Sequence, residues 1–199
     1  MSGIDIEVVR AQIPALDKSI YMNTGGTGPV PTFVANEIAE TYRRMSELGP
    51  DLPEIRGPIK AELERARQVS ADLFNVSTDE IAMMRAISEG MSTVAWGLDW
   101  SPGDEVIVTS EEHPTGMLVW LNLAERRGIT VKHLDIATDK SELLFRLSGL
   151  ITDRTRLLSM SHVTTDTGTR LPAKEICQLA HTREVPVLLD GAQSVGQFP

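Results

Sequence analysis

From residue 80 onward, short apolar runs alternate with longer segments whose apolar residues recur with helical spacing. The runs predict strands at 80–84, 105–109, 130–134, 156–160 and 186–189, and the longer segments predict helices at 89–98, 115–127, 140–150 and 172–182. Strands joined through helices pair in parallel, because each helix returns the chain to the same end of the sheet. The sequence therefore predicts an α/β fold with a mostly parallel sheet of five strands and helices on its faces.

The part before this alternation is predicted to be helical and to carry one prominent loop. It should contain a weak helix at 1–10, an extended piece at 20–22, a loop of glycine, threonine and proline at 23–31, a helix at 32–48, an interruption at 50–58 and a helix at 59–74. We divide the chain into an N-terminal segment that includes this loop, residues 1–32, and a large domain, residues 33–199.

Composition excludes several classes of partner. The formal net charge is −9, which argues against nucleic acid and anionic membrane surfaces. No apolar stretch is long enough to cross a bilayer, and Met1–Asp5 lacks the basic start and apolar block of a signal peptide. A single cysteine, Cys177, excludes an internal disulfide and is typical of a reducing compartment. We expect a cytoplasmic protein without a metal site.

Polar residues follow four of the predicted strands. The carboxyl ends of parallel strands share one edge of a sheet, where ligands bind in open α/β folds. At Arg85–Gly90, Ser88 is expected to cap a helix whose free backbone N–H groups could hold an anion, although an ordinary cap has the same pattern. His113 follows the next strand, where an imidazole could stack on a flat ring, move protons or be purely structural.

The two remaining clusters are a hydroxyl-rich loop and an acidic turn. The loop at 161–171 contains Thr165 and could donate hydrogen bonds to a ligand, or serve as a normal connection. An apolar run then delivers Asp190 to the end of the last strand, followed by a turn that contains Gln193. Four polar clusters at one sheet edge predict a binding site rather than a purely structural domain.

Taken in order, these motifs resemble the class V aminotransferase family of fold-type I enzymes, which use pyridoxal 5′-phosphate (PLP). The resemblance runs from Tyr21 to Gln193, above all to the cysteine desulfurase/selenocysteine lyase and isopenicillin N epimerase-like branches. Its most specific pieces are Asp190-Gly191-Ala192-Gln193 and Glu112-His113 with Trp120 downstream. It implies a three-layer PLP-dependent transferase-like large domain, here truncated and without the C-terminal small domain.

The resemblance also implies a role for each cluster. It assigns the cofactor phosphate to Ile87 and Ser88, ring stacking and acid–base work to His113, the phenolic oxygen to Thr165 and Gln193, and the ring nitrogen to Asp190. A carboxylate beside that nitrogen keeps it protonated, so that the ring can accept electrons from the substrate. Desulfurases usually carry asparagine at the position of Thr165, and Arg85–Gly90 looks more like the epimerase-like branch.

On the substrate side, the resemblance implies that Gly25 and Gly26 line the site and that Arg56 lies near its mouth. The family's Schiff-base lysine lies downstream of the Asp-Gly-Ala-Gln turn, and none of the five lysines matches it; they are Lys18, Lys60, Lys132, Lys140 and Lys174. Cys177 lies on a helix flank and does not match the desulfurase nucleophile. We therefore expect an N-terminal fragment that carries the cofactor-binding half of a site.

The sequence is compatible with three functions. The first is a PLP-dependent enzyme that acts on an amino acid through an aldimine and an α-carbanion, of the desulfurase, lyase, epimerase or aminotransferase type, and typically a homodimer. The second is a non-catalytic fragment or pseudoenzyme that binds PLP weakly or serves as a dimerisation partner. The third is a nucleotide-binding Rossmann domain, but Gly25–Gly28 lacks the required glycine spacing and runs into Pro29.

Overall fold

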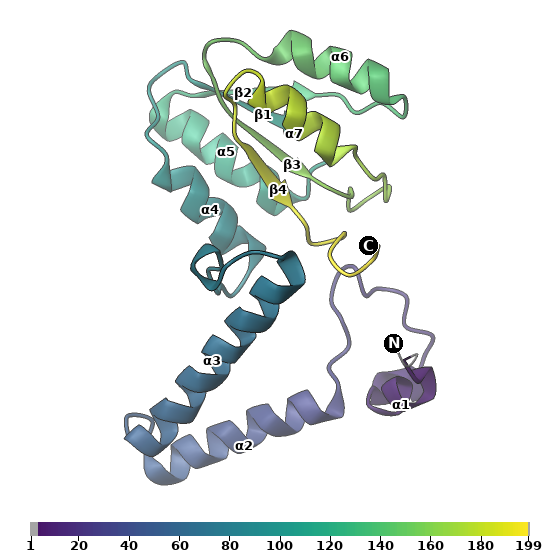
Figure 1. Ribbon diagram of the computed structural model, residues 1–199, viewed down its shortest axis with the longest axis vertical. Helices are drawn as coiled ribbons and strands as arrows, with labels where there is room; N and C mark the ends of the chain where they lie inside the picture. The colour runs from purple at the N-terminus through teal and green to yellow at the C-terminus, as the bar shows by residue number, and fades with distance from the viewer. Residues whose placement is uncertain (1–3, 199) are drawn as a thin grey trace. The chain divides into compact units, whose positions relative to one another are not determined.

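In the computed structural model, which describes residues 4–198, the chain divides after Met83 into two units (Figure 1). The sequence placed a boundary after residue 32 instead. The division after Met83 leaves the strands in the second unit and the long helices at 32–74 in the first. The assignment of residues 33–199 to one cofactor-binding domain stays a prediction.

The second unit is a four-stranded sheet with helices between its strands. Its elements are α4 (Ile87–Gly97), β1 (Glu105–Thr109), α5 (Pro114–Arg127), β2 (Thr130–Leu134), α6 (Lys140–Leu150), β3 (Thr155–Ser161), α7 (Ala173–His181) and β4 (Val187–Asp190). The strands are all parallel, in the order β2-β1-β3-β4. The predicted α/β class and parallel sheet are confirmed.

The fifth predicted strand, at residues 80–84, is wrong. Glu80 ends a short 3-10 helix, η2 (Thr78–Glu80), whose start is fixed by reciprocal bonds between Ser77 and Glu80. Ile81 is extended, but its carbonyl accepts a hydrogen bond from the Arg67 guanidinium and not from a neighbouring strand. An apolar run therefore lies here without a strand partner among the described residues.

Two hydrophobic cores lie on opposite faces of the sheet. Along β1, Ile107 packs on the face covered by α6 and α7, while Val106 and Val108 pack on the face covered by α4 and α5. This alternation follows from the pleat of a strand, which points successive side chains to opposite faces. Trp120 is fully buried on the α4/α5 side, edge-on to Trp100 at 6.1 Å between ring centroids. The result is a three-layer α/β/α arrangement (Figure 1).

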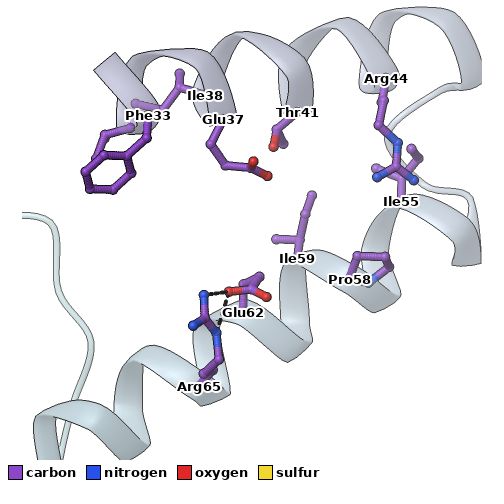
Figure 2. Close-up of a pocket in the computed structure, with 11 residues that line it drawn as sticks. Phe33, Glu37, Ile38, Thr41, Arg44, Ile55, Pro58, Ile59, Glu62 and Arg65 are labelled. Atoms are coloured by element: carbon purple, nitrogen blue, oxygen red, sulfur yellow. Dashed lines mark hydrogen bonds and ion pairs between the residues drawn. The ribbon is translucent and has the colours of Figure 1, made fainter. Parts of the chain in front are cut away.

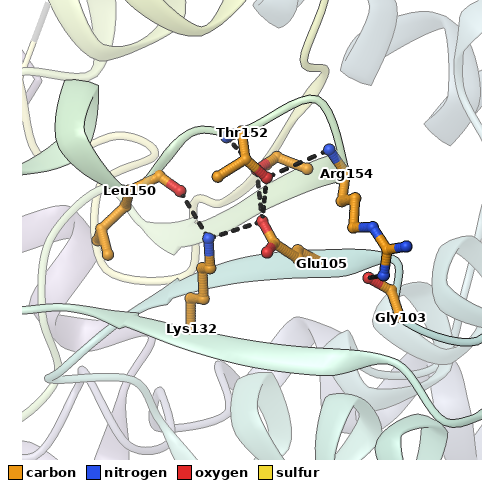
Figure 3. Close-up of polar contacts among 7 residues, drawn as sticks. Gly103, Glu105, Lys132, Leu150, Thr152 and Arg154 are labelled. Carbon is orange, nitrogen blue, oxygen red and sulfur yellow. Dashed lines mark hydrogen bonds and ion pairs between the residues drawn. The ribbon is translucent and has the colours of Figure 1, made fainter.

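A partly buried ion pair closes the amino end of the sheet (Figure 3). Lys132 Nζ lies 2.7 Å from Glu105 Oε2 and donates to the Leu150 carbonyl at 3.0 Å. The hydroxyls of Thr152 and Thr155 donate to the same carboxylate oxygen at 2.6 and 3.1 Å. Burial alone would raise the pKa of Glu105, but the bonds from Lys132 and the two threonines outweigh it and hold that pKa below its usual value.

The first unit is helical. It contains α1 (Ile6–Ala11), the 3-10 helix η1 (Pro14–Asp17), α2 (Thr32–Leu48), α3 (Pro53–Phe74) and η2. The bounds predicted for α2 are confirmed, whereas residues 20–22 are not assigned to a strand.

The predicted interruption at 50–58 is wrong in its second half, because α3 begins at Pro53. Proline suits this first position, where a backbone N–H would have no helical partner. Pro58 lies inside the helix and cannot donate to the Glu54 carbonyl one turn earlier. The Arg44 guanidinium donates to that carbonyl instead, at 3.2 Å, which compensates for the missing bond.

Candidate functional site

The candidate site is built on the carboxyl edge of the sheet, where β1, β3 and β4 end at Thr109, Ser161 and Asp190. The register pairs Ser161 with Asp190, so the ends of β3 and β4 lie side by side. Helix α4 also packs against the start of α5, because the Met91 methyl lies about 4.0 Å from where a Gly116 side chain would begin. The sheet therefore brings several predicted clusters toward one edge.

The start of α4 leaves backbone donors free. Ala86 is the N-cap and makes no side-chain cap bond, so the prediction that Ser88 is the cap is wrong. Ser88 lies in the first turn, and the N–H groups of Ile87 and Ser88 donate to no carbonyl in the described part of the chain. Free N–H groups at a helix start attract anions, which is the property that the sequence predicted here.

One acidic side chain sits at the same helix start. Glu89 accepts a hydrogen bond from the Arg85 N–H at 2.9 Å and lies 3.4 Å from its guanidinium. These bonds, the backbone one first, lower the pKa of Glu89. The carboxylate is thus already paired with donors, which reduces its repulsion of an anion at the neighbouring N–H groups.

His113 is the N-cap of α5 and remains exposed. Its Nδ1 accepts the Thr115 N–H at 3.3 Å and lies 2.8 Å from the Thr115 hydroxyl oxygen. Because Nδ1 is an acceptor, the proton of the neutral ring lies on Nε2. The imidazole is therefore oriented by its own helix and still offers a face and an N–H to a ligand.

Glu112, one residue earlier, has hydrogen-bond partners that its place in the sequence does not predict. Its carboxylate accepts bonds from the Thr109 hydroxyl at the end of β1 and from both the N–H and the hydroxyl of Ser161 at the end of β3. The sequence signal was an acid directly before His113 at a strand end, but its partner on β3 is 49 residues away.

Most hydroxyls of the loop after β3 already have hydrogen-bond partners, either within the loop or on the glutamates that follow β1. The Thr164 hydroxyl is buried and accepts the Thr169 N–H at 3.0 Å, and Thr167 donates to Glu111 at 2.6 Å. Thr165 is exposed, and its hydroxyl has no hydrogen-bond partner among the described residues. Thr165 is thus the hydroxyl of this loop that remains available, as its predicted role requires.

Asp190 is the last residue of β4 and is 9% exposed. Its Oδ1 accepts the Ala192 N–H at 2.9 Å, and its carbonyl accepts the His162 N–H at 2.9 Å. Gln193 lies half-buried in the turn that follows, which Ser194 closes through bonds to the Gly191 carbonyl. The carboxylate is held in one orientation at the strand end.

The predicted substrate-side residues lie in the first unit. Gly26 and Thr27 donate to the Asn23 carbonyl at 3.2 and 3.0 Å, which closes the loop that contains Gly25. A Cβ on Gly26 would lie 2.7 Å from the Asn23 side-chain oxygen, so a larger residue would displace that side chain. The predicted mouth residue, Arg56, is exposed on α3, 72% of its side chain being accessible.

A groove of about 650 Å³ lies between α2 and α3 (Figure 2). Apolar side chains such as Phe33, Ile38 and Ile59 face it, together with Glu37 and Arg44. Arg56 is not among its lining residues. The predicted mouth residue is therefore separate from this hollow.

Cys177 and two of the lysines, which the sequence did not match to the family's nucleophile or Schiff-base lysine, are half-buried or paired in the structure. Cys177 is half-buried on α7, and burial raises the pKa of its thiol, which keeps it protonated and weakly nucleophilic at neutral pH. Lys132 and Lys140 form ion pairs with Glu105 and Glu175.

Residues 4–198 contain no helix with the length and apolar composition that a membrane span needs. Among the same residues, no three histidine, cysteine, aspartate or glutamate side chains gather as metal ligands would.

Comparison with protein families gives one match over most of the chain. Residues 20–199 match the family model described as Aminotransferase class-V. A probable cysteine desulfurase of Halobacterium salinarum is 30% identical, over 96% of this chain and 49% of its own length. The chain spans about half the length of the curated relatives it matches.

Solved structures are also similar. A lysine-to-alanine variant of C-DES, with glycine covalently linked to its PLP cofactor, has a TM-score of 0.88 at 33% identity, over 96% of this chain and 51% of that one. The cysteine desulfurase CsdA of Escherichia coli has a TM-score of 0.82 at 27% identity, over 100% of this chain and 51% of that one.

Proposed function

Because this chain belongs to the class-V aminotransferase family, we propose that it is the PLP-holding part of an enzyme that acts on a sulfur-containing amino acid, cysteine first among the candidates. The match to cysteine desulfurases supports this reaction class over epimerisation and transamination. The 33% identity to a protein with bound PLP supports the cofactor.

The chemistry of the donor set fits PLP. The cofactor has a phosphate at one end and a basic ring nitrogen. The carboxyl edge of the sheet offers hydrogen-bond donors for the phosphate and a carboxylate for the nitrogen. The free N–H groups of Ile87 and Ser88 suit the phosphate, and the Asp190 carboxylate suits a protonated nitrogen. This pairing of two unlike sites in one unit is the observation that carries the proposal.

When bound, PLP supplies an electron sink for the pair left behind when a bond to the substrate α-carbon breaks. In our proposal, Asp190 keeps the ring nitrogen protonated, and its bond from Ala192 N–H holds the carboxylate in place for this task. His113 covers one ring face and holds a proton on Nε2. Thr165 and Gln193 are proposed to donate to the phenolic oxygen.

Cofactor binding is tested by equilibrium dialysis and by the ³¹P NMR signal of PLP, with pyridoxal and inorganic phosphate as competitors. Pyridoxal controls for random reaction of an aldehyde with surface lysines. We expect saturable PLP binding that pyridoxal does not match, and an approximately tenfold loss in Asp190→Ala, the effect of one charge-assisted hydrogen bond. Asp166→Ala removes an exposed acid from a nearby loop and serves as the control. Equal uptake of PLP and pyridoxal would contradict the proposal.

The reaction class is tested with cysteine as substrate in the PLP-loaded protein. Alanine, with its sulfur released as sulfide once a thiol reductant is supplied, indicates desulfuration, whereas pyruvate with ammonia and sulfide indicates a lyase. A keto acid that keeps the sulfur indicates transamination, and a change of configuration alone indicates epimerisation. Product formed only when a chain that supplies the Schiff-base lysine is added would support the fragment of an active enzyme. Saturable PLP binding without product even then would support the non-catalytic alternative. Homodimerisation is proposed by resemblance alone, and sedimentation velocity tests it.

A further inference from the structure

We propose that Glu112 is a positioning residue, which fixes the turn that carries His113 against the end of β3. The imidazole would then be placed by two strands, although it follows only β1 in sequence. The importance of this placement for catalysis rests on the function proposed above, but the placement itself is a property of the chain alone.

The first support is the bonding of the carboxylate. One oxygen accepts the Ser161 N–H at 2.8 Å and also the Thr109 hydroxyl, while the other accepts the Ser161 hydroxyl at 2.8 Å. Thr109 is 0% and Ser161 3% exposed, so these donors cannot turn to water. Three buried donors would lose their partner without Glu112, which makes its position strongly determined.

The second support is the space left by Gly116. This glycine is in the first turn of α5, and a Cβ there would lie 3.1 Å from a Glu112 carboxylate oxygen. The carboxylate therefore lies against the helix start, where a negative charge is favourable. Glu112 thus touches β1, β3 and α5 at their common corner, and His113 is the next residue.

The third support is the kind of partner that Glu112 has. No ion pair involves it among the described residues, and its donors are neutral groups on the backbone or on hydroxyls. Such bonds are directional and short-ranged, so they fix geometry more than they compensate charge. Among residues 4–198, Thr115 is the one residue that bonds the His113 ring, so the ring follows the position of the turn that Glu112 joins to β3.

The test reads the imidazole directly, in the 199-residue chain without cofactor. The ring ¹⁵N shifts of His113 report how the proton divides between Nδ1 and Nε2. In Glu112→Ala we expect the preference for Nε2–H to fall about fivefold, the equivalent of one ordinary hydrogen bond. Glu112→Gln keeps an acceptor oxygen at the same place and should restore most of the preference.

The matched control is Glu105→Ala. Glu105 also accepts hydrogen bonds from two hydroxyls, those of Thr152 just before β3 and Thr155 at its start, but it lies at the opposite end of the sheet. It should leave the His113 shifts unchanged. Unchanged shifts in Glu112→Ala, or a Gln variant that behaves like Ala, would overturn the positioning role.

A second variant separates positioning from unfolding. Gly116→Ala improves helix propensity and disturbs the site only by crowding the carboxylate. We expect shifted His113 signals in a folded protein, and unshifted signals count against the proposal. These His113 signals are measured without cofactor. A failure to bind PLP would therefore contradict the proposed function but would not affect the test of Glu112.

Discussion

The two ends of the sheet each carry a glutamate that joins β1 to β3, and the two are partnered differently. At the amino end, Glu105 accepts the hydroxyls of Thr152 and Thr155 and also pairs with Lys132. At the carboxyl end, Glu112 accepts hydroxyl and N–H donors but has no ion-pair partner among residues 4–198.

The difference separates stability from binding. The Glu105 carboxylate at the amino end is neutralised by Lys132, and Thr152 and Thr155 donate their hydroxyls to it. At the carboxyl end, Glu112 joins β1 to β3 through hydrogen bonds. The Ile87 and Ser88 N–H groups and the exposed His113 ring remain available to a ligand. We expect substitutions at the amino end to change stability alone, and those at the carboxyl end to change stability and the site together.

The largest expected effect is Lys132→Met. It leaves the Glu105 carboxylate without its cation while the side chain is only 13% exposed. We expect the free energy of unfolding to fall by about 2 kcal/mol, between the values for exposed and buried pairs. Urea denaturation measures it, and Lys132→Met combined with Glu105→Gln should recover part of the loss. If Lys132→Met also shifted the His113 ¹⁵N signals, the two ends of the sheet would not be independent, contrary to the comparison.

At the other end, Ser161→Ala removes one buried donor from Glu112. We expect a loss of about 1.5 kcal/mol in urea unfolding, typical of a hydrogen bond to a charged group. Ser159→Ala is the matched control on the same strand, because the Ser159 hydroxyl is fully buried and has no partner among the described residues. That control should be neutral or stabilising, and equal losses in both variants would contradict the role of the bond.

The amino end should contribute to the pH dependence of stability through Glu105. Because the pKa of Glu105 is lower in the folded chain than its ordinary value of 4.5, its contribution is complete above 4.5 and is lost as pH falls through the folded pKa. Stability measured from neutral pH down to acid should therefore fall less steeply in Glu105→Gln than in the unmodified chain. Parallel profiles would show that Glu105 does not contribute.

The smallest expected effect is Lys140→Met. Its ion pair with Glu175 joins α6 to α7 at the surface, where 57% and 36% of the two side chains are exposed. Solvent and salt screen such a pair, so the urea midpoint should stay unchanged within error. A loss as large as that of Lys132→Met would show that exposure does not separate the two pairs.

The sequence predicted the sheet unit well because its signals are local. β1, β2 and α6 have the bounds that periodicity predicts, and Gly128 ends α5 with a φ of 69°, a conformation that favours glycine. The errors have local competitors. Ser88 had the chemistry of a cap, but Ala86 has the extended backbone of one. Residues 80–84 have the composition of a strand, but within residues 4–198 no strand pairs with them.

The candidate site could be predicted only in part. Strand ends are visible in sequence, so Asp190 and His113 were placed at the correct edge. The partners of Glu112 depend on the register between β1 and β3, which no local pattern contains. The Gly116 space is invisible for the same reason. Roles toward the cofactor, for all the proposed residues, stay predictions.

The strand order also sets a timetable for folding. β1 lies between β2 and β3, and about 45 residues must be synthesised after Thr109 before β3 begins at Thr155. At a synthesis rate of roughly 5–20 residues per second, about 2–9 s pass between the synthesis of β1 and the start of β3, its second neighbour in the sheet. Val106, Ile107 and Val108 have two open strand edges until β2 (Thr130–Leu134) is made and one until β3 follows, so the nascent chain is exposed to aggregation through this interval and most of all before β2 pairs.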